Sequence, residues 1–278
     1  MNEKTKSFLF KGWILLSTLI VLAIVFYIFG YILSNGIESI NMEFLLDGPS
    51  GIPVGSQGGI FPAIVGSLLL MLISCVFASI LAISTSIYLV FYCESERIKG
   101  LIHLITQCMS GVPSIILGLF GYTFLVLYLN LGRSVLAGGL TLGFMIYPFI
   151  QVRVEKTLLE VDKSIINSSY ALGISRTYTL FKLILPICKS DIVSAITLAG
   201  GFAMGAASPI ILTAAVTFAP IPSSLSSPVM ALPFHLYILT GEGISLEKAY
   251  GTALVLILLL LIINIISTII NITRKEHK

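Results

Sequence analysis

The sequence predicts an all-α membrane protein with about six transmembrane helices. Hydrophobic residues make up 56% of the 278 residues, and charged residues only 10%. Several uncharged runs reach the roughly 20 residues that a helix needs to cross the hydrocarbon core. Lipid offers no partners to backbone polar groups, so a span is either a helix or a strand of a closed barrel. Because the runs are much longer than barrel strands, we expect helices and exclude a soluble domain.

The first expected span follows three lysines, Lys4, Lys6 and Lys11. This start resembles a signal peptide, but its apolar part is about twice as long as a usual signal core and no small-residue cleavage site follows. We therefore expect a retained anchor. The six expected spans cover residues 13–33, 60–92, 101–130, 134–151, 192–218 and 246–270.

Positive charges orient the expected spans. With the N-terminus inside, 14 of the 16 Lys and Arg residues lie on the cytoplasmic side, and the exceptions are Arg133 and Lys248. This asymmetry is the positive-inside pattern, with both termini cytoplasmic. The sequence has no basic patch with interleaved aromatic residues, so we expect no nucleic-acid binding. The expected partner of the apolar surface is the lipid bilayer. The expected organisation is a tail (1–12), an anchor (13–33), an outer loop (34–59), a main transmembrane domain (60–271) with a cytoplasmic loop (152–191), and a tail (272–278).

The four cysteines form no C-x-x-C pair, and the sequence therefore indicates no metal site. The polar interruption at 152–191 is more informative, because polar insertions of this size often bind a partner. Its apolar residues recur at spacings of three and four, which predicts short amphipathic helices. Gly173 is expected to end one helix in a left-handed cap, and Pro186 to mark the return to the membrane. A solvated loop that only connects two spans remains the alternative.

Within this loop, NSSYALGISRTYTLFKLILP (167–186) resembles the coupling motif of ABC importer permeases, which is usually EAA, three residues, Gly, nine residues and I-x-LP. Gly173, Leu185 and Pro186 have the motif's spacing. Asn167, Ser168 and Ser169 stand in place of EAA, so its acidic residue is absent. The resemblance implies that this segment docks into a groove of an ATP-hydrolysing subunit.

Four further segments resemble the A-type permease of the Pst phosphate-specific ABC transporters: residues 58–92, GVPSIILGLFGYTFLV (111–126), GAASPIILTA (205–214) and ALPFHLYILTGEG (231–243). The resemblance implies a type I, MetI-like permease fold in a bacterial or archaeal cell membrane. It implies import of inorganic phosphate by alternating access. The implied partners are a homologous C-type permease, B-type ATP-binding subunits and an extracytoplasmic S-type phosphate-binding protein.

The chain is expected to be a transporter subunit without a cofactor of its own, not an enzyme. A P-loop requires Gly-Lys, and this dipeptide never occurs here. ATP and Mg²⁺ would therefore bind to partner subunits.

Residues 192–241 contain no Asp, Glu, Lys or Arg. A crossing oxyanion must exchange its hydration for other donors. We expect these from the hydroxyls of Ser208 and Thr213, from backbone amides at helix breaks near Gly205 and Pro209, or from a partner subunit. His235 is a further candidate donor at the outer mouth, or a satisfied buried histidine. Pro113 is expected to kink the third span, as a gate or for packing alone.

The Pst permeases carry an Arg and, four residues later, a Glu in this region, and the matching positions here are Phe202 and Ala206. An intramembrane ion pair is the default functional candidate in a transporter. Two explanations for the missing ion pair are open: the paired permease retains the charges, or the substrate of the complex is another oxyanion. A structural or regulatory subunit is the remaining alternative.

Overall fold

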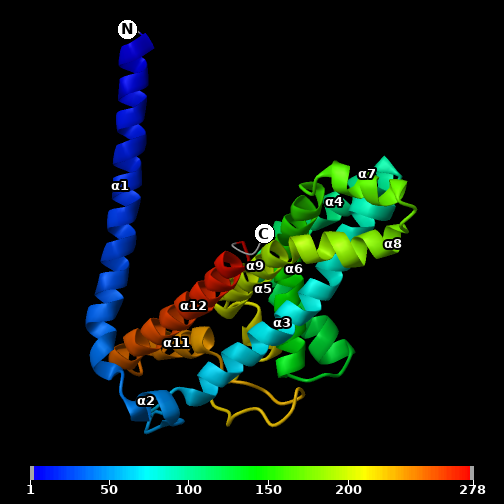
Figure 1. The fold of residues 1–278 in the computed structure, drawn as a ribbon. Coiled ribbons are helices and arrows are strands. Elements are labelled where there is room, and N and C mark those ends of the chain that lie inside the picture. The colour runs from blue at the N-terminus through cyan, green and yellow to red at the C-terminus, as the bar shows by residue number, and fades with distance from the viewer. Residues whose placement is uncertain (1–2, 276–278) are drawn as a thin grey trace.

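The computed structural model describes residues 3–275, and its first helix stands largely apart from the others (Figure 1). Helix α1 (Glu3–Gly36) includes most of the predicted tail 1–12, whereas residues 1–2 and 276–278 of the predicted tails lie outside the described residues. Near its C-terminal end α1 meets α12 (Leu246–Lys275), where the Tyr31 and Tyr250 rings pack edge to face with centroids 5.7 Å apart. A side chain at Gly36 would lie 2.7 Å from the Tyr250 carbonyl oxygen, so glycine permits this contact.

A compact outer loop follows α1. It contains the short helices η1 (Ile37–Ser39) and α2 (Met42–Leu46) and a hairpin of β1 (Pro49–Ser50) and β2 (Gln57–Gly58), paired antiparallel. The Asn41 side chain accepts from the backbone N–H of Phe44 and caps α2. The Lys248 ammonium donates to the Gly58 carbonyl at 2.6 Å, which fixes the hairpin against the start of α12.

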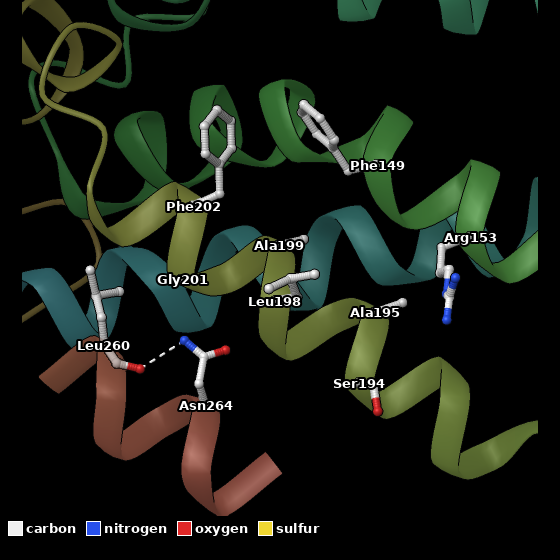
Figure 2. A pocket seen from close by; sticks show the side chains of 10 residues that line it. All are labelled: Phe149, Arg153, Ser194, Ala195, Leu198, Ala199, Gly201, Phe202, Leu260 and Asn264. Carbon is white, nitrogen blue, oxygen red and sulfur yellow. Dashed lines mark hydrogen bonds between the residues drawn. The ribbon is translucent and has the colours of Figure 1, made fainter. Parts of the chain in front are cut away.

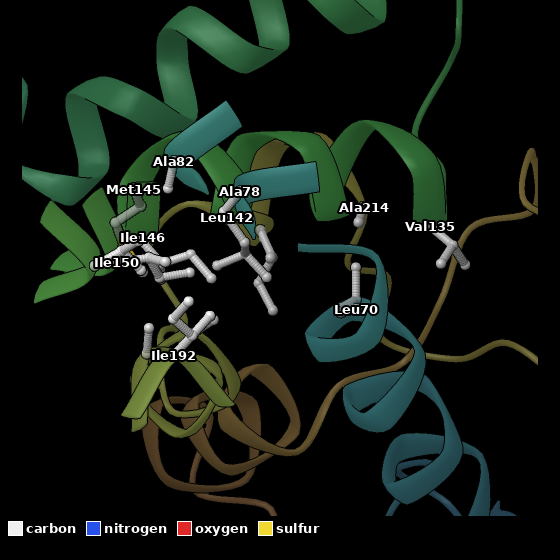
Figure 3. Packing of buried hydrophobic residues seen from close by; sticks show 14 of the residues in the cluster. Leu70, Ala78, Ala82, Val135, Leu142, Met145, Ile146, Ile150, Ile192 and Ala214 are labelled. Atoms are coloured by element: carbon white, nitrogen blue, oxygen red, sulfur yellow. The ribbon is translucent and has the colours of Figure 1, made fainter. Parts of the chain in front are cut away.

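The centre of the bundle is the contact between α3 (Phe61–Ile87) and α6 (Val135–Leu159). Their buried side chains include Leu70 and Ala78 from α3 and Leu142 and Ile146 from α6 (Figure 3). Without a hydrophobic driving force in lipid, helices associate through close packing at small residues. Consistent with this, a Cβ at Gly139 would lie 2.5 Å from the Ile73 Cγ2 atom.

The predicted third span, 101–130, is not one straight helix. Helix α4 (Glu96–Ser110) ends before Pro113, and α5 (Ser114–Gly121) with the π-helical η3 (Tyr122–Tyr128) continues at an angle of 99°. Proline lacks a donor and disfavours a helical conformation at the residue before it, which accounts for the break. The second expected span is confirmed as α3 followed by the π-helical η2 (Tyr88–Tyr92).

The predicted fifth span, 192–218, is displaced. The membrane-length helix runs from Arg176 to Met204, through α8 (Arg176–Thr179), the π-helical η4 (Leu180–Ile184) and α9 (Leu185–Met204). Pro186 therefore lies inside a helix and does not mark the predicted return. The preceding π turn makes space for the Pro186 ring, and the helix there does not require the hydrogen bond that the missing proline N–H would donate. The actual turn lies between α7 (Lys163–Ala171) and α8.

After α9 the chain breaks and forms α10 (Ile210–Thr213), then a long connection to α11 (Leu232–Gly241). The Ser67 hydroxyl accepts from the backbone N–H of Leu232 at 2.8 Å and holds α11 against α3. Within residues 3–275, five helices are long and apolar enough to cross a membrane, or six if the bent pair α4–α5 counts as one span. The predicted all-α, multi-span fold is confirmed. Figure 1 places the start of α1 together with α7 and α8 toward one end and α2 at the other.

Replacing Gly139 with Ala is expected to destabilise the protein. The added methyl would meet the branched Ile73 side chain, and such overpacking costs about 1–3 kcal/mol. The matched control is Gly30→Ala on α1, where a Cβ meets nothing within 4 Å. We expect a lower thermal midpoint in detergent for Gly139→Ala alone, and equal midpoints for both variants would contradict the tight α3–α6 contact.

Candidate functional site: an open groove between three helices

A groove of about 710 Å³ lies between α6, α9 and α12 (Figure 2). Its walls present residues spaced by about one turn on each helix, so each helix contributes one continuous face. The lining residues are Phe149 and Arg153 of α6, Ser194, Ala195, Leu198, Ala199, Gly201 and Phe202 of α9, and Leu260 and Asn264 of α12.

One end of the groove is aromatic. The rings of Phe149 and Phe202 meet edge to face with centroids 5.2 Å apart, and the side chain of Phe202 remains 54% exposed. Phe202 is the residue that we expect to match the Arg of the Pst-type pattern. Here the groove therefore offers an apolar surface instead of a cation.

The other end of the groove is polar. Arg153 is exposed, and in Figure 2 its guanidinium extends across the groove toward the part of α9 that carries Ser194 and Ala195. The Ser194 hydroxyl donates to the Ser190 carbonyl at 3.0 Å. Asn264 lies beside Gly201, nearer the aromatic end; one N–H of its amide donates to the Leu260 carbonyl at 2.8 Å, so the amide retains a second N–H donor.

The other predicted path residues lie beyond the C-terminal end of α9. Gly205 caps that helix, and Ala206 and Ser208 are partly buried in the break before α10. Pro209 lies against α5, because a Cβ at Gly118 would approach the Pro209 Cα to 3.0 Å. The buried Thr213 hydroxyl donates to the Pro209 carbonyl at 2.8 Å within its own helix. The predicted break at Gly205–Pro209 is present, and of the predicted path residues Phe202 alone lines the groove.

His235 lies on α11, which is not one of the membrane-length helices, and its side chain is 4% exposed. Its Nδ1 atom has no hydrogen-bond partner, and a side chain at Gly55 in the outer loop would lie 3.8 Å from its Cε1 atom. Burial, with a smaller contribution from the positive Lys248, lowers the pKa of His235 to about 4. The imidazole is therefore neutral near pH 7.

The predicted coupling segment has a well-defined end. The Ile174 N–H donates to the Ser169 carbonyl and the Gly173 N–H to the Tyr170 carbonyl, which is a Schellman cap, with Gly173 at φ +74°. The predicted left-handed cap is therefore present. The buried Ser169 hydroxyl lies 2.6 Å from that of Thr179 and joins α7 to α8, whereas Asn167 and Ser168 are exposed.

A second cavity, of about 700 Å³, lies between α4 and α6 and shares Phe149 and Arg153 with the groove. The Glu155 carboxylate is occupied there, at 2.8 Å from the His103 Nε2 atom and 2.7 Å from the Gln151 amide nitrogen. In residues 3–275 no carboxylate lies within ion-pair distance of Arg153. Sequence reasoning did not single out Arg153 or Asn264. The sequence signal that could have indicated them is a polar residue four positions after an apolar groove residue on the same helix, Arg153 after Phe149 and Asn264 after Leu260.

Comparison with known proteins agrees with this architecture. Residues 82–272 match the family described as the binding-protein-dependent transport system inner membrane component. This chain belongs to that family. It is therefore a membrane permease subunit of an ABC importer, and ATP hydrolysis in such systems lies on a separate chain. The family implies an ATPase and a substrate-binding protein as partners.

The resemblance to A-type phosphate permeases is also confirmed. A probable phosphate transport system permease protein PstA from Methanocaldococcus jannaschii is 32% identical, with 75% of this chain and 74% of that protein covered. PstA 2 from Mycobacterium bovis is 30% identical, with 78% and 73% covered. A probable ABC transporter permease protein, YqgI of Bacillus subtilis, is 26% identical, with 95% of each chain covered.

Solved structures show the same fold. A chain of the MetNI methionine ABC transporter in an inward-facing conformation aligns with a TM-score of 0.63 at 18% identity, covering 76% of this chain and 94% of that chain. A chain of a bacterial ABC transporter involved in alginate import aligns with a TM-score of 0.63 at 15% identity, covering 97% and 98%. The MetI-like permease fold is therefore confirmed.

Acidification is expected to destabilise the chain through His235. Its pKa of about 4 in the folded chain lies below the ~6.5 of an unfolded histidine, so the unfolded chain binds more protons between these values. This contribution to stability is complete above about pH 6.5 and is lost as the pH falls toward 4. The thermal midpoint in detergent should fall over this window, and less so for His235→Asn. Equal falls would contradict the buried neutral state.

Proposed function

We propose that this chain is the A-type permease subunit of an importer for inorganic phosphate in a bacterial or archaeal cell membrane. The observation that carries the proposal is the similarity to PstA proteins from Mycobacterium bovis and Methanocaldococcus jannaschii, at 30–32% identity over about three quarters of the chain. The proposed partners are a C-type permease, B-type ATP-binding subunits that hold ATP and Mg²⁺, and an S-type phosphate-binding protein. No cofactor is assigned to this chain.

The coupling segment is the proposed contact with the ATP-binding subunits. Helix α7 is short, ends in a Schellman cap and exposes Tyr170 and Leu172, of which the second is 79% exposed. These apolar side chains offer a docking surface that does not require the acidic residue absent at 167–169. The Ser169–Thr179 hydrogen bond joins this surface to the helix that continues as α9, so a push on α7 would reach the wall of the groove.

Reconstitution tests the proposed substrate. The complete importer, with its binding protein, second permease and ATPase, is placed in proteoliposomes, and uptake of labelled phosphate and sulfate is measured with ATP inside. We expect phosphate to be taken up and to stimulate ATP hydrolysis, with little response to sulfate. Transport of sulfate instead would overturn the phosphate assignment while leaving the importer assignment intact.

Phe202 and Ala206 favour a second candidate, a structural or regulatory permease-like subunit, because the charge pair of the Pst-type pattern is absent. Gly201→Trp discriminates between the two. A Cβ at Gly201 would face Leu260 and Asn264 at 3.5 and 3.8 Å, so an indole there fills the groove. A transporting subunit would lose uptake while still copurifying with its partners, whereas a structural subunit would retain uptake.

Gly173→Val is expected to uncouple ATP hydrolysis from uptake. No atom lies within 4 Å of a Cβ at Gly173, so the cost arises from the positive φ, about 1–2 kcal/mol for a residue with a Cβ. The control is Gly173→Asn, because asparagine tolerates this conformation. The measurement is phosphate transported per ATP hydrolysed, which should fall for Val and remain near normal for Asn. Normal coupling in Gly173→Val would remove α7 from the coupling role.

A further inference from the structure

The groove is polarised along its length by α6 and α9, which run in opposite directions. On α6 the apolar Phe149 precedes Arg153, and on α12 Leu260 precedes Asn264, each four residues apart. Helix α9 runs the opposite way, and there the polar Ser194 precedes the apolar Leu198 and Phe202. Arg153 and Ser194 therefore lie toward the same end of the groove, whereas Asn264 lies beside Gly201, nearer the aromatic end (Figure 2).

Arg153 is the ionised side chain in this lining. Arginine remains charged at any physiological pH and presents its N–H groups as a planar fork that matches oxyanions. Arg153 is exposed, so its guanidinium is accessible to an anion that enters the groove. The neighbouring Glu155 is engaged by His103 and Gln151, and no described carboxylate takes its place on Arg153.

We propose that Arg153 forms an oxyanion-binding site at the polar end of the groove, with Ser194 on the facing wall. This inference rests on the proposed import function and gives it a cation within this chain. The ligand is inorganic phosphate, held after it has passed the Phe149–Phe202 pair. Asn264, beside Gly201, offers a neutral N–H donor nearer the aromatic end of the groove.

Transport by Arg153→Gln in the reconstituted importer tests the proposal. Loss of a charge-assisted hydrogen bond weakens an interaction roughly ten- to hundred-fold, so phosphate uptake at subsaturating phosphate should fall by up to about that factor. Arg153→Lys, which keeps the charge but not the fork, should lie between native and Gln. Lys156→Gln, three residues away and paired with Glu160 on the surface, is the matched control and should transport normally. Normal uptake in Arg153→Gln would overturn the site.

A second readout separates binding from structure. Leu198 is 68% exposed in the groove, and a cysteine introduced there with Leu198→Cys can be modified by a maleimide and quantified by mass spectrometry. Phosphate should slow this modification when Arg153 is present and have no effect in the Arg153→Gln background. Equal protection in both backgrounds would contradict the site even if uptake falls.

Three further outcomes would assign Arg153 another partner and thus overturn the proposal. Asp191 precedes Ser194 by about one turn on α9, and an Asp191→Asn variant that reproduces the Arg153→Gln loss would indicate an ion pair within the chain. Loss of copurification in Arg153→Gln would indicate a carboxylate of the second permease. Protection of the Leu198→Cys thiol by anionic lipid vesicles without phosphate, and not by neutral ones, would indicate a lipid headgroup.

The test also distinguishes failure of the site from failure of the proposed substrate. If the native importer transports sulfate and not phosphate, the proposed function fails. The maleimide modification of the Leu198→Cys thiol is then compared with and without Arg153→Gln in the presence of sulfate. Protection of this thiol by sulfate that requires Arg153 would still support the site. If phosphate is transported equally by both, the site fails and the proposed function stands.

Discussion

The close approach of α3 and α6 is the contact on which the rest of the molecule depends. It is possible because glycines such as Gly139 face bulky side chains on α3, leaving no room for a Cβ. The Ser86 hydroxyl adds a donor to the Gln151 carbonyl at 3.1 Å. With α6 fixed against α3 in this way, Phe149 and Arg153 of the same helix lie at the groove, and the end of the helix leads directly to α7. One helix thus positions both the groove wall and the segment that meets the partner ATPase in our proposal.

The packing in the groove explains how Phe202 is accommodated where an Arg was expected. Where the Pst-type pattern places an Arg, this chain has Phe202, whose ring packs on Phe149 of α6. A new charge at 202 would have to be solvated beside that ring, whereas Arg153 lies one turn farther along α6 at the polar end. The chain therefore retains a cation along the groove, although not at the position that the Pst-type pattern predicts. In our proposal, Arg153 supplies the positive potential that an oxyanion would meet in this groove.

The sequence predicted helical spans because a long apolar run has one stable solution in lipid. Within residues 3–275 five helices have membrane length, and the predicted six are reached only if the bent pair α4–α5 counts as one span. The sequence also predicted the left-handed cap at Gly173, which depends on local geometry. It placed the fifth span too late, because the polar residues of Arg176–Ser190 hid a helix that continues through Pro186 on a π turn. The sequence did not indicate Arg153 as a groove residue. Which side chains line the groove depends on how α6, α9 and α12 pack together, and a local sequence pattern does not predict that packing. Ser208 and Thr213, chosen for their hydroxyls, lie beyond α9, where Thr213 bonds its own helix.

A structure of the complete importer in an inward-facing state, determined with phosphate present, tests the central claim most directly. The account predicts tetrahedral density within hydrogen-bond distance of the Arg153 guanidinium, in the groove between α6 and α9, and absent from a phosphate-free preparation. A groove filled by side chains of the second permease, with Arg153 bonded to a protein carboxylate and phosphate bound elsewhere, would contradict it.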